Sequence, residues 1–353
     1  MSKENNVAKK QDTKNTGMAL ARMGASGLKV SPLCLGAMMF GARTDAREAG
    51  RIVAHAQDAG VNFIDTADVY AKGESERIVG KLIKREREHW VLATKAGNPM
   101  GGGAHRQGIS RRWLTQAIDE SLGRLDLDHV DLWYLHRDDE ATPMAEVVGA
   151  VADVIRAGKA RYWGLSNFRA WRIVEAIETA KAMGAPPPVA VQPYYNAMNR
   201  SPEYEILPAC RHFGVGVVPY SPLARGVLTG KYDPNKPPPV DSRAGRNDER
   251  MMQTEFRKES LLAARTIKAH AEKKGMTAGQ FATLWVLANR TVTSVLAGPR
   301  TLGQWKEYVA AFDRVGTIGP ADEKLIDLLV APGHPSTPGD SDPKYPPNGR
   351  RTA

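Results

Sequence analysis

The chain has 353 residues, and its 49 Lys and Arg residues against 39 Asp and Glu give a formal net charge of +10. Hydrophobic residues make up 42% and charged residues 25%, an ordinary composition for a folded globular protein, which excludes fibrous and wholly disordered classes. No stretch reaches the roughly 18 apolar residues of a membrane-spanning helix, and the start of the chain lacks the apolar run of a signal peptide. Two cysteines, Cys34 and Cys210, are too few for a disulfide framework. We therefore expect a cytoplasmic protein without a membrane partner.

The positive charge is spread along the chain. Residues 1–22 carry +3 and residues 334–353 carry +1, which leaves +6 for residues 23–333. No basic run is interleaved with aromatic residues, so a solvated surface is favoured over nucleic-acid binding, and we expect no nucleic-acid partner. The first segment is rich in Lys, Asn and Gln and the last in Pro, Ser and Gly, so we expect a flexible N-terminal tail over 1–22 and a C-terminal tail over 334–353.

Short apolar runs alternate with amphipathic stretches throughout residues 23–333. These runs are too continuously apolar for half-exposed antiparallel strands and are typical of buried parallel strands. Glycines such as Gly60 and Gly214 end the amphipathic stretches, as expected of helix C-termini. The predicted strands are Leu33–Gly36, Val61–Asp65, Trp90–Thr94, Val130–His136, Arg161–Leu165, Val189–Gln192, Val215–Tyr220 and Thr293–Ala297.

Eight strand–helix units favour one closed (β/α)8 barrel, an α/β fold of the TIM-barrel type, over an open doubly wound sheet. A dinucleotide-binding sheet also needs an early G-x-G-x-x-G, and the starts at Gly101 and Gly214 have Arg106 and Pro219 where the third Gly belongs. The long stretch between the seventh and eighth strands predicts an extra loop and helices. In such a barrel, polar residues at the C-terminal strand ends build the active site.

Four polar residues lie at or just after these strand ends: Asp65, Tyr70, Lys95 and His136. A tyrosine hydroxyl with a pKa near 10 is a weak acid, and the cation Lys95 beside it is expected to lower that pKa. Asp65 can hold the lysine ammonium, and His136 can donate to a carbonyl oxygen and orient it. Together the four residues predict a site that protonates an oxyanion.

The residues around these four positions resemble the aldo-keto reductase family, over about Arg22 to Ala311. The segment Phe63-Ile-Asp-Thr-Ala-Asp-Val-Tyr70, followed by Gly73-Glu-Ser-Glu76, is similar to the family's sequence around its catalytic Asp and Tyr. Ala93-Thr-Lys95 and Asp131-Leu-Trp-Tyr-Leu-His136 resemble its Lys and His strands. The resemblance implies NAD(P)H-dependent carbonyl reduction, in which Tyr70 protonates the oxygen and the hydride comes from nicotinamide C4.

The resemblance also implies where the nicotinamide binds. Ser166, Asn167 and Gln192 match the family positions that hold the carboxamide, and Tyr220 matches the aromatic residue that stacks on the ring. The segment around Ser166 also has some likeness to a hydrolase nucleophile elbow. Phe168 stands where that elbow needs its second glycine, which makes a hydrolase improbable.

Two later segments resemble those that bind the remainder of the cofactor. The loop that contains Ser221, Leu223, Arg225 and Gly226 is similar to the loop that folds over the pyrophosphate. The second segment begins at Gly298, with Arg300 matched to the 2′-phosphate and Gln304 to adenine, so that NADPH is preferred over NADH. The family commonly has Asn where this chain has Tyr308, and NADH use therefore stays open.

The substrate is a small-molecule carbonyl compound whose size the sequence leaves open. Met38, Met39 and Phe40 follow the first strand and are expected to line the mouth, although packing is an equal alternative for the two methionines. The stretches 97–108 and 231–252 are expected to border it. Small aldehydes and a ketone on a bulkier cyclic metabolite both remain possible.

Other functions also remain open. Some proteins that resemble aldo-keto reductases are cofactor-binding regulatory subunits of potassium channels, and the four site residues do not exclude that role. A metallohydrolase can share the barrel, but the first strand is followed by no H-x-H and the chain has no H-E-x-x-H, so we expect no metal. The sequence does not specify an oligomeric state.

Overall fold

The computed structural model describes residues 18–337, 339 and 342–345. Eight parallel strands form one sheet, and each strand pairs with its neighbour along the chain, while the last also pairs with the first. Parallel bridges Val217–Val292 and Tyr220–Leu296 join the seventh strand to the eighth and close the ring. The strands are β3 (Leu33–Gly36), β4 (Phe63–Asp65), β5 (Val91–Ala96), β6 (Val130–Leu135), β7 (Ala160–Ser166), β8 (Ala190–Gln192), β9 (Gly216–Val217) and β10 (Val295–Ala297). The predicted (β/α)8 barrel is thus confirmed, strand by strand.

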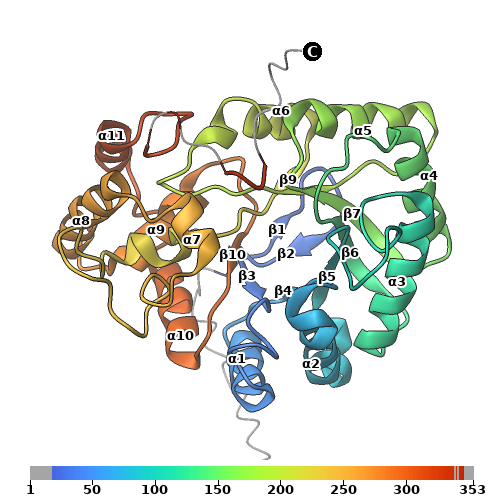
Figure 1. Cartoon of the computed structure of the whole chain (residues 1–353), viewed down its shortest axis with the longest axis horizontal. Coiled ribbons are helices and arrows are strands. Elements are labelled where there is room, and N and C mark those ends of the chain that lie inside the picture. Colours follow the sequence, from blue (N-terminus) through green and yellow to red (C-terminus); the bar gives the residue numbers. More distant parts are fainter. Residues whose placement is uncertain (1–17, 338, 340–341, 346–353) are drawn as a thin grey trace, which may run out of the picture.

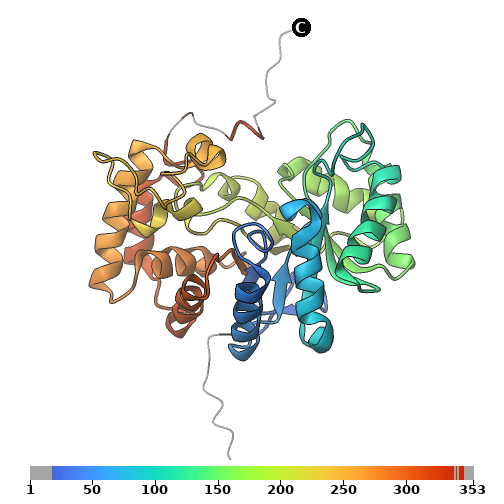
Figure 2. The same ribbon diagram turned by 60° about the horizontal axis from the view of Figure 1, so that its bottom comes forward.

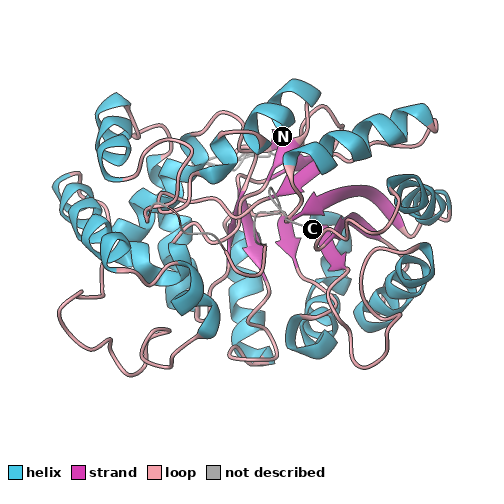
Figure 3. Cartoon of the chain, turned by 45° about the horizontal axis from the view of Figure 1, so that its top comes forward, coloured by secondary structure: helices cyan, strands magenta, loops and turns pink. Residues whose placement is uncertain are grey.

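Helices surround the strands on the outside (Figures 1 and 3). Side chains cap several of them; Asp45 caps α1 and Thr277 forms a capping box on α9, each worth about 1 kcal/mol. The predicted extra helices between the last two strands are α7, α8 and α9, with a short 3-10 segment at Ala224–Thr229. The α-helices are α1 (Ala46–Asp58), α2 (Glu74–Ile83), α3 (Arg111–Leu125), α4 (Met144–Arg156), α5 (Ala170–Ala182), α6 (Ile206–Phe213), α7 (Glu249–Thr254), α8 (Lys258–Lys273), α9 (Ala278–Ala288), α10 (Leu302–Ala311) and α11 (Pro320–Leu329).

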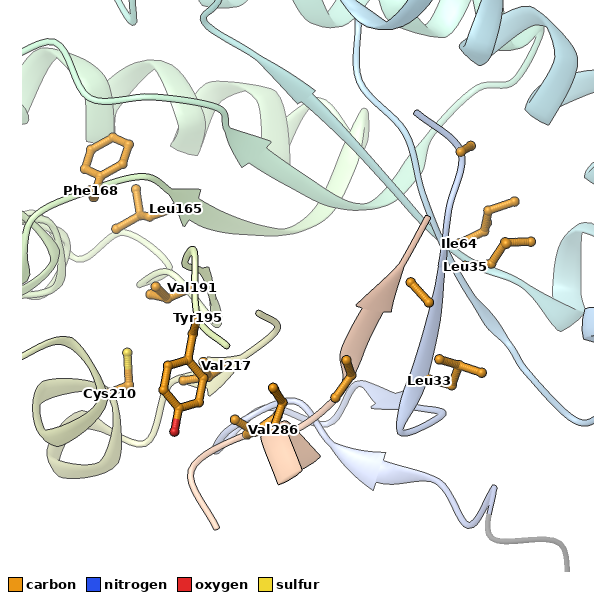
Figure 4. Close-up of a cluster of buried hydrophobic side chains, with 14 of the residues drawn as sticks. Leu33, Leu35, Ile64, Leu165, Phe168, Val191, Tyr195, Cys210, Val217 and Val286 are labelled. Carbon is orange, nitrogen blue, oxygen red and sulfur yellow. The ribbon is translucent and has the colours of Figure 1, made fainter. Parts of the chain in front are cut away.

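Alternate residues of each strand face two separate cores, because successive side chains point to opposite faces of a sheet. One set, which includes Leu33, Leu35 and Ile64, packs against the helices (Figure 4). The other set fills the barrel interior and includes Cys34, Phe63, Ala93, Leu132, Tyr134 and Val218. Burial on both faces explains why the strands read as continuous apolar runs in the sequence.

A short hairpin closes one end of the barrel. Strands β1 (Ala21–Arg22) and β2 (Lys29–Val30) pair antiparallel, and Met23 between them belongs to the interior core. The chain approaches so closely here that a Cβ on Gly24 would lie 2.2 Å from the carbonyl oxygen of Gly214. The sequence did not predict this hairpin, because strands of two residues leave no periodic pattern. The apolar hairpin leaves the opposite end of the barrel for the polar residues.

The described part of the C-terminal segment lies against the barrel, which differs from the free tail expected for residues 334–353. The backbone N–H of Ser336 donates to the carbonyl of Met198 at 2.8 Å, and Arg200 N–H donates to the carbonyl of His334 at 3.0 Å. Further along, Asp342 forms an ion pair with Arg250 on α7. A segment rich in Pro, Ser and Gly cannot form a hydrophobic core of its own. It can still make hydrogen bonds and ion pairs with the surface of a barrel that has already folded. The expected N-terminal tail lies mostly outside the described residues.

Candidate active site

The polar residues of the site continue the inward-facing rows of the strands. Asp65 stands two residues after Phe63 on β4, Lys95 two residues after Ala93 on β5, and His136 two residues after Tyr134 on β6. Ser166 and Gln192 end β7 and β8 and are paired in register. The period of two that buries apolar side chains in the barrel therefore also directs these polar side chains to its carboxyl end.

Asp65 and Lys95 form a buried ion pair at this end. The side chains are 1% and 0% exposed, and the ammonium of Lys95 contacts Asp65 and donates to the carbonyl of Thr66 at 2.8 Å. The other oxygen of Asp65 accepts from Nε2 of Gln192 at 3.0 Å. Burial lowers the pKa of Lys95, but Asp65 and Tyr70 outweigh burial and raise it overall, so the ammonium stays charged.

Tyr70 lies over this ion pair. Its hydroxyl is 3.4 Å from Nζ of Lys95, which also lies 4.9 Å from the centre of the ring. The next two residues, Ala71 and Lys72, have φ of 49° and 56°, a conformation that strains residues other than glycine. Such strain persists where the surrounding structure holds a functional side chain in place.

The pKa of Tyr70 differs from the sequence prediction. Burial raises it above the ordinary value of a tyrosine, and Lys95 lowers it by less than burial raises it. The prediction of a lowered pKa was wrong because it counted the cation and omitted desolvation, which disfavours the phenolate. A neutral Tyr70 has a proton to donate, and the ammonium of Lys95 at 3.4 Å can stabilise the phenolate that donation would leave.

His136 faces Tyr70 edge-on, with the ring centres 5.7 Å apart. Burial first, and then Lys95, lowers the pKa of His136 well below its ordinary value, so the imidazole is neutral. Its Nδ1 has no hydrogen-bond partner in the described part of the chain, and its backbone carbonyl accepts from Nδ2 of Asn167 at 2.9 Å. A neutral imidazole beside the ring of Tyr70 is suited to hold a carbonyl oxygen by hydrogen bonding.

These residues open into a cavity of about 700 Å³ at the carboxyl ends of the strands. Tyr70, Asp65 and His136 line it, with Lys95 behind them. Every residue that the resemblance assigned to the cofactor also lines it, in a set that spans four strand ends: Ser166, Asn167, Gln192, Tyr220, Ser221, Leu223, Arg225, Gly226, Gly298, Arg300 and Gln304. The volume lies within the range of ordinary ligand sites.

Residues 32–322, most of the chain, match the model of the aldo/keto reductase family. The chain belongs to this family. It is 37% identical over 320 residues to a protein of Arabidopsis thaliana named "Probable voltage-gated potassium channel subunit beta", covering 89% of this chain and 97% of that one. It is 35% identical over 330 residues to "Uncharacterized oxidoreductase YrpG" of Bacillus subtilis, covering 90% and 97%.

The cavity of this aldo-keto reductase suits an anionic dinucleotide, because cationic side chains outnumber acidic ones in its walls. Eight are Lys or Arg and two, Asp65 and Glu307, are acidic. A Cβ added to Gly298 would meet nothing within 4 Å, so the wall is open there. The Arg300 guanidinium forms no ion pair within the described residues and is free for an anion.

Sequence reasoning named Arg225 and Arg300 and expected the stretch 231–252 to border the pocket, as it does, but it did not single out the other six cations. Lys344 comes from the C-terminal segment, and the others flank the cavity from loops: Arg43, Lys231, Arg243, Arg246 and Arg250. A usable signal was present, since three arginines stand within eight residues from 243 to 250. Without the fold, nothing separates such a run from an ordinary solvated surface.

The side chains of Arg225 and Asn167 already make contacts within the protein, which the sequence did not indicate. Nε of Arg225 lies 2.8 Å from the buried carboxylate of Glu255, which also accepts from the hydroxyl of Tyr194 at 2.6 Å. Oδ1 of Asn167 accepts from the hydroxyl of Tyr220 at 2.8 Å. These contacts fix the side chains in the cavity wall, and a ligand that uses the same atoms has to share or replace them.

The expected pocket residues divide into two groups. Met38 and Met39 line the cavity, whereas Phe40 is fully buried in the outer core and does not. A turn in which the N–H of Phe40 donates to the carbonyl of Ala37 at 3.0 Å reverses the chain. The phenyl ring therefore points into the core and not into the mouth, and its assignment to the pocket was wrong.

Two further observations concern the described residues alone. No helix among them has the length and apolarity to cross a bilayer. No three of their His, Cys, Asp or Glu side chains gather as a metal ion requires.

Proposed function

We propose that this aldo-keto reductase reduces an aldehyde or ketone to the alcohol with NADPH, and that Tyr70 supplies the proton. The observation that carries the proposal is the contact of the neutral Tyr70 hydroxyl with the Lys95–Asp65 ion pair at the wall of a cationic cavity. When bound, the nicotinamide supplies a hydride to the carbonyl carbon. The protein's part is to hold the oxygen, protonate it and neutralise the charge that forms.

Each of the four residues has a separate task. Tyr70 donates its proton to the carbonyl oxygen, and the charge that this leaves on Tyr70 is stabilised by the ammonium of Lys95 at 3.4 Å. Asp65 holds that ammonium in place, with Gln192 as its second partner. His136, neutral and beside Tyr70, orients the oxygen by hydrogen bonding.

The preference for NADPH rests on Arg300 and the cations near it. A guanidinium without an acidic partner can receive a 2′-phosphate with two hydrogen bonds, worth about 1.5 to 3 kcal/mol for charged groups. Arg300→Ala should therefore weaken NADPH binding by tenfold or more and NADH binding little. Cofactor fluorescence titration measures both. Arg290→Ala, outside the cavity, is the matched control, and equal losses for both cofactors would refute the 2′-phosphate role.

The reaction itself is tested with a carbonyl panel. Purified protein is offered small aldehydes and bulky cyclic ketones with either cofactor, and nicotinamide absorbance is followed. We expect turnover with at least one carbonyl class, faster with NADPH, and no loss of activity on adding a chelator. If the panel shows no reduction with either cofactor, the proposal fails.

A second candidate is a cofactor-binding regulatory subunit, favoured by the names of relatives in Arabidopsis thaliana and in Oryza sativa, each a "Probable voltage-gated potassium channel subunit beta" at 37% identity. In that role we expect the chain to bind cofactor without steady turnover. Steady NADPH consumption on an aldehyde contradicts it as the main role. A cytoplasmic location without a nucleic-acid partner fits both candidates, and binding to DNA with a steep salt dependence would contradict this last part.

A further inference from the structure

The turn that follows Tyr70 is strained. Three successive residues have positive φ: Ala71 and Lys72 at 49° and 56°, and Gly73 at 91°. A left-handed conformation costs free energy at the first two of these residues, and it persists only where the surrounding structure holds it. The groups that hold this turn therefore help to decide where the hydroxyl of Tyr70 lies.

The side chain of Arg124, on α3, packs against this turn. A Cβ added to Gly73 would come within 2.5 Å of Cδ of Arg124 and within 3.0 Å of its Nε. A glycine at this position therefore admits the arginine as well as the positive φ. The arginine side chain is only 11% exposed, so it is an internal support of the turn.

Glu76, on α2, holds Arg124 and is fully buried. Its Oε2 accepts from Nε of Arg124 at 2.6 Å, and its Oε1 accepts from the hydroxyl of Thr94 at 2.5 Å. Thr94 immediately precedes Lys95 on β5. One buried carboxylate thus connects the turn that carries Tyr70 with the strand that carries Lys95.

The two helices that provide this ion pair are in close contact. A Cβ added to Gly80 on α2 would lie 1.9 Å from the carbonyl oxygen of Leu125 on α3. Figure 2 shows α2, in light blue, beside α3, in teal. At the start of α2, the hydroxyl of Ser75 donates to the carbonyl of Ala37 at 2.8 Å. Because the helices are packed this tightly, a change in the ion pair is expected to relax through the strained turn.

The ion pair lies outside the walls of the catalytic cavity, which include neither Glu76 nor Arg124. Stability alone does not account for it, since the attraction between two buried charges only roughly offsets their desolvation. A guanidinium hydrogen-bonded to a carboxylate does fix the relative positions of the elements that carry them. This is a property that an apolar pair of the same volume lacks.

We propose that Glu76 and Arg124 are positioning residues, which hold the hydroxyl of Tyr70 in contact with Nζ of Lys95. They act through the turn and through β5. Without their geometry, the hydroxyl moves away from the ammonium while the walls that face the cofactor stay in place. This inference rests on the proposed carbonyl reduction, and its test includes a readout that needs no turnover.

The test uses two variants and a matched control. Arg124→Lys keeps the charge but removes the planar guanidinium, and Glu76→Gln keeps the shape of the acceptor but removes its charge. The control is Arg87→Lys. Nη2 of Arg87 donates to Asp131 at 2.6 Å, and this pair is 14% and 20% exposed. It also joins the segment after α2 to a barrel strand, but near the amino end of that strand.

We expect each of the two variants to lower kcat by about tenfold or more, because a displacement of about 1 Å near reacting groups can cost about 100-fold. The KM for NADPH should stay within about twofold of the parent value, since no cofactor contact is removed. The control should change neither constant. If the two variants lose stability in urea but keep the kcat of the parent, the role is structural and the proposal is overturned.

The second readout is the carbon-13 NMR signal of Tyr70 in protein labelled at tyrosine Cζ. This signal is the one that is absent from Tyr70→Phe. We expect it to move by more than its linewidth in both variants and to keep its position in Arg87→Lys. If the parent reduces no carbonyl, the proposed reaction fails and this signal alone decides about the positioning role. A signal that stays in place in the variants overturns the proposal, and if one variant does not fold, the other decides.

Discussion

At one end of the barrel interior, Phe63, Ala93 and Leu132 belong to the same buried apolar cluster as Met23 of the hairpin. Two residues further along the same strands, Asp65 and Lys95 form a buried ion pair. At the first end, the removal of apolar surface from water stabilises the folded state. The second end pays a desolvation penalty that the pairing only roughly offsets. The apolar end therefore stabilises the barrel, and this stabilisation compensates for the cost of burying reactive charged groups at the polar end.

The largest difference between the two ends should appear in activity. Tyr70→Phe removes the proton donor at the polar end, and we expect kcat/KM for carbonyl reduction to fall by about 10³-fold, within the range for general acid catalysis. Tyr162→Phe, which removes a hydroxyl from a tyrosine against the apolar interior cluster, is the control. The comparison breaks if both variants lose activity equally, or if neither does.

The next largest effect is on stability at the polar end. Lys95→Met leaves Asp65 buried without its cation and should lower the free energy of unfolding by about 3 to 5 kcal/mol. Adding Asp65→Asn should restore most of that stability but none of the activity, since the ammonium is still absent. Urea unfolding and kinetics on the same samples measure both. A double variant as unstable as Lys95→Met would show that the ion pair itself stabilises the fold.

A substitution at the apolar end should lower stability by a similar amount but leave activity unchanged. Phe63→Ala leaves a cavity among fully buried neighbours and should cost about 3 to 5 kcal/mol of stability. The kcat of the folded fraction should change little, because Phe63 contacts no reacting atom. Urea unfolding gives the stability, and active-site titration with cofactor gives the folded fraction. A large loss of kcat with normal stability would mean that the two ends are not independent.

A smaller effect concerns Asp68, which lies between Asp65 and Tyr70 in the sequence. Burial, and then Glu76, raises the pKa of Asp68 to about 8, far above the 3.8 of an exposed aspartate. Because the folded state holds this proton more tightly, Asp68 favours folding at low pH, and that contribution is lost as pH rises towards 8. Asp68→Asn should remove this loss. The free energy of unfolding of the variant, relative to that of the parent, should therefore rise by about 2 to 4 kcal/mol between pH 5 and pH 9. A pH-independent difference in urea unfolding would contradict the raised pKa.

The sequence by itself determined the barrel and the positions of Asp65, Lys95 and His136. Strand periodicity is a local property, and eight apolar runs with polar residues at their ends leave few alternatives to a closed parallel barrel. The residues that the family resemblance matched to the cofactor all line one cavity in the structure, and their role stays a prediction.

Tertiary structure decided what depends on burial and on loops. The raised pKa of Tyr70 comes from desolvation, which no spacing of residues reveals. Phe40 lies in the core and not in the predicted pocket, because a turn reverses the direction of the chain there. The arginines from 243 to 250 and the C-terminal Lys344 reached the cavity from segments without periodicity. Their positions are set by contacts between residues far apart in the chain, such as Arg250 with Asp342, and such contacts exist only once the barrel has formed.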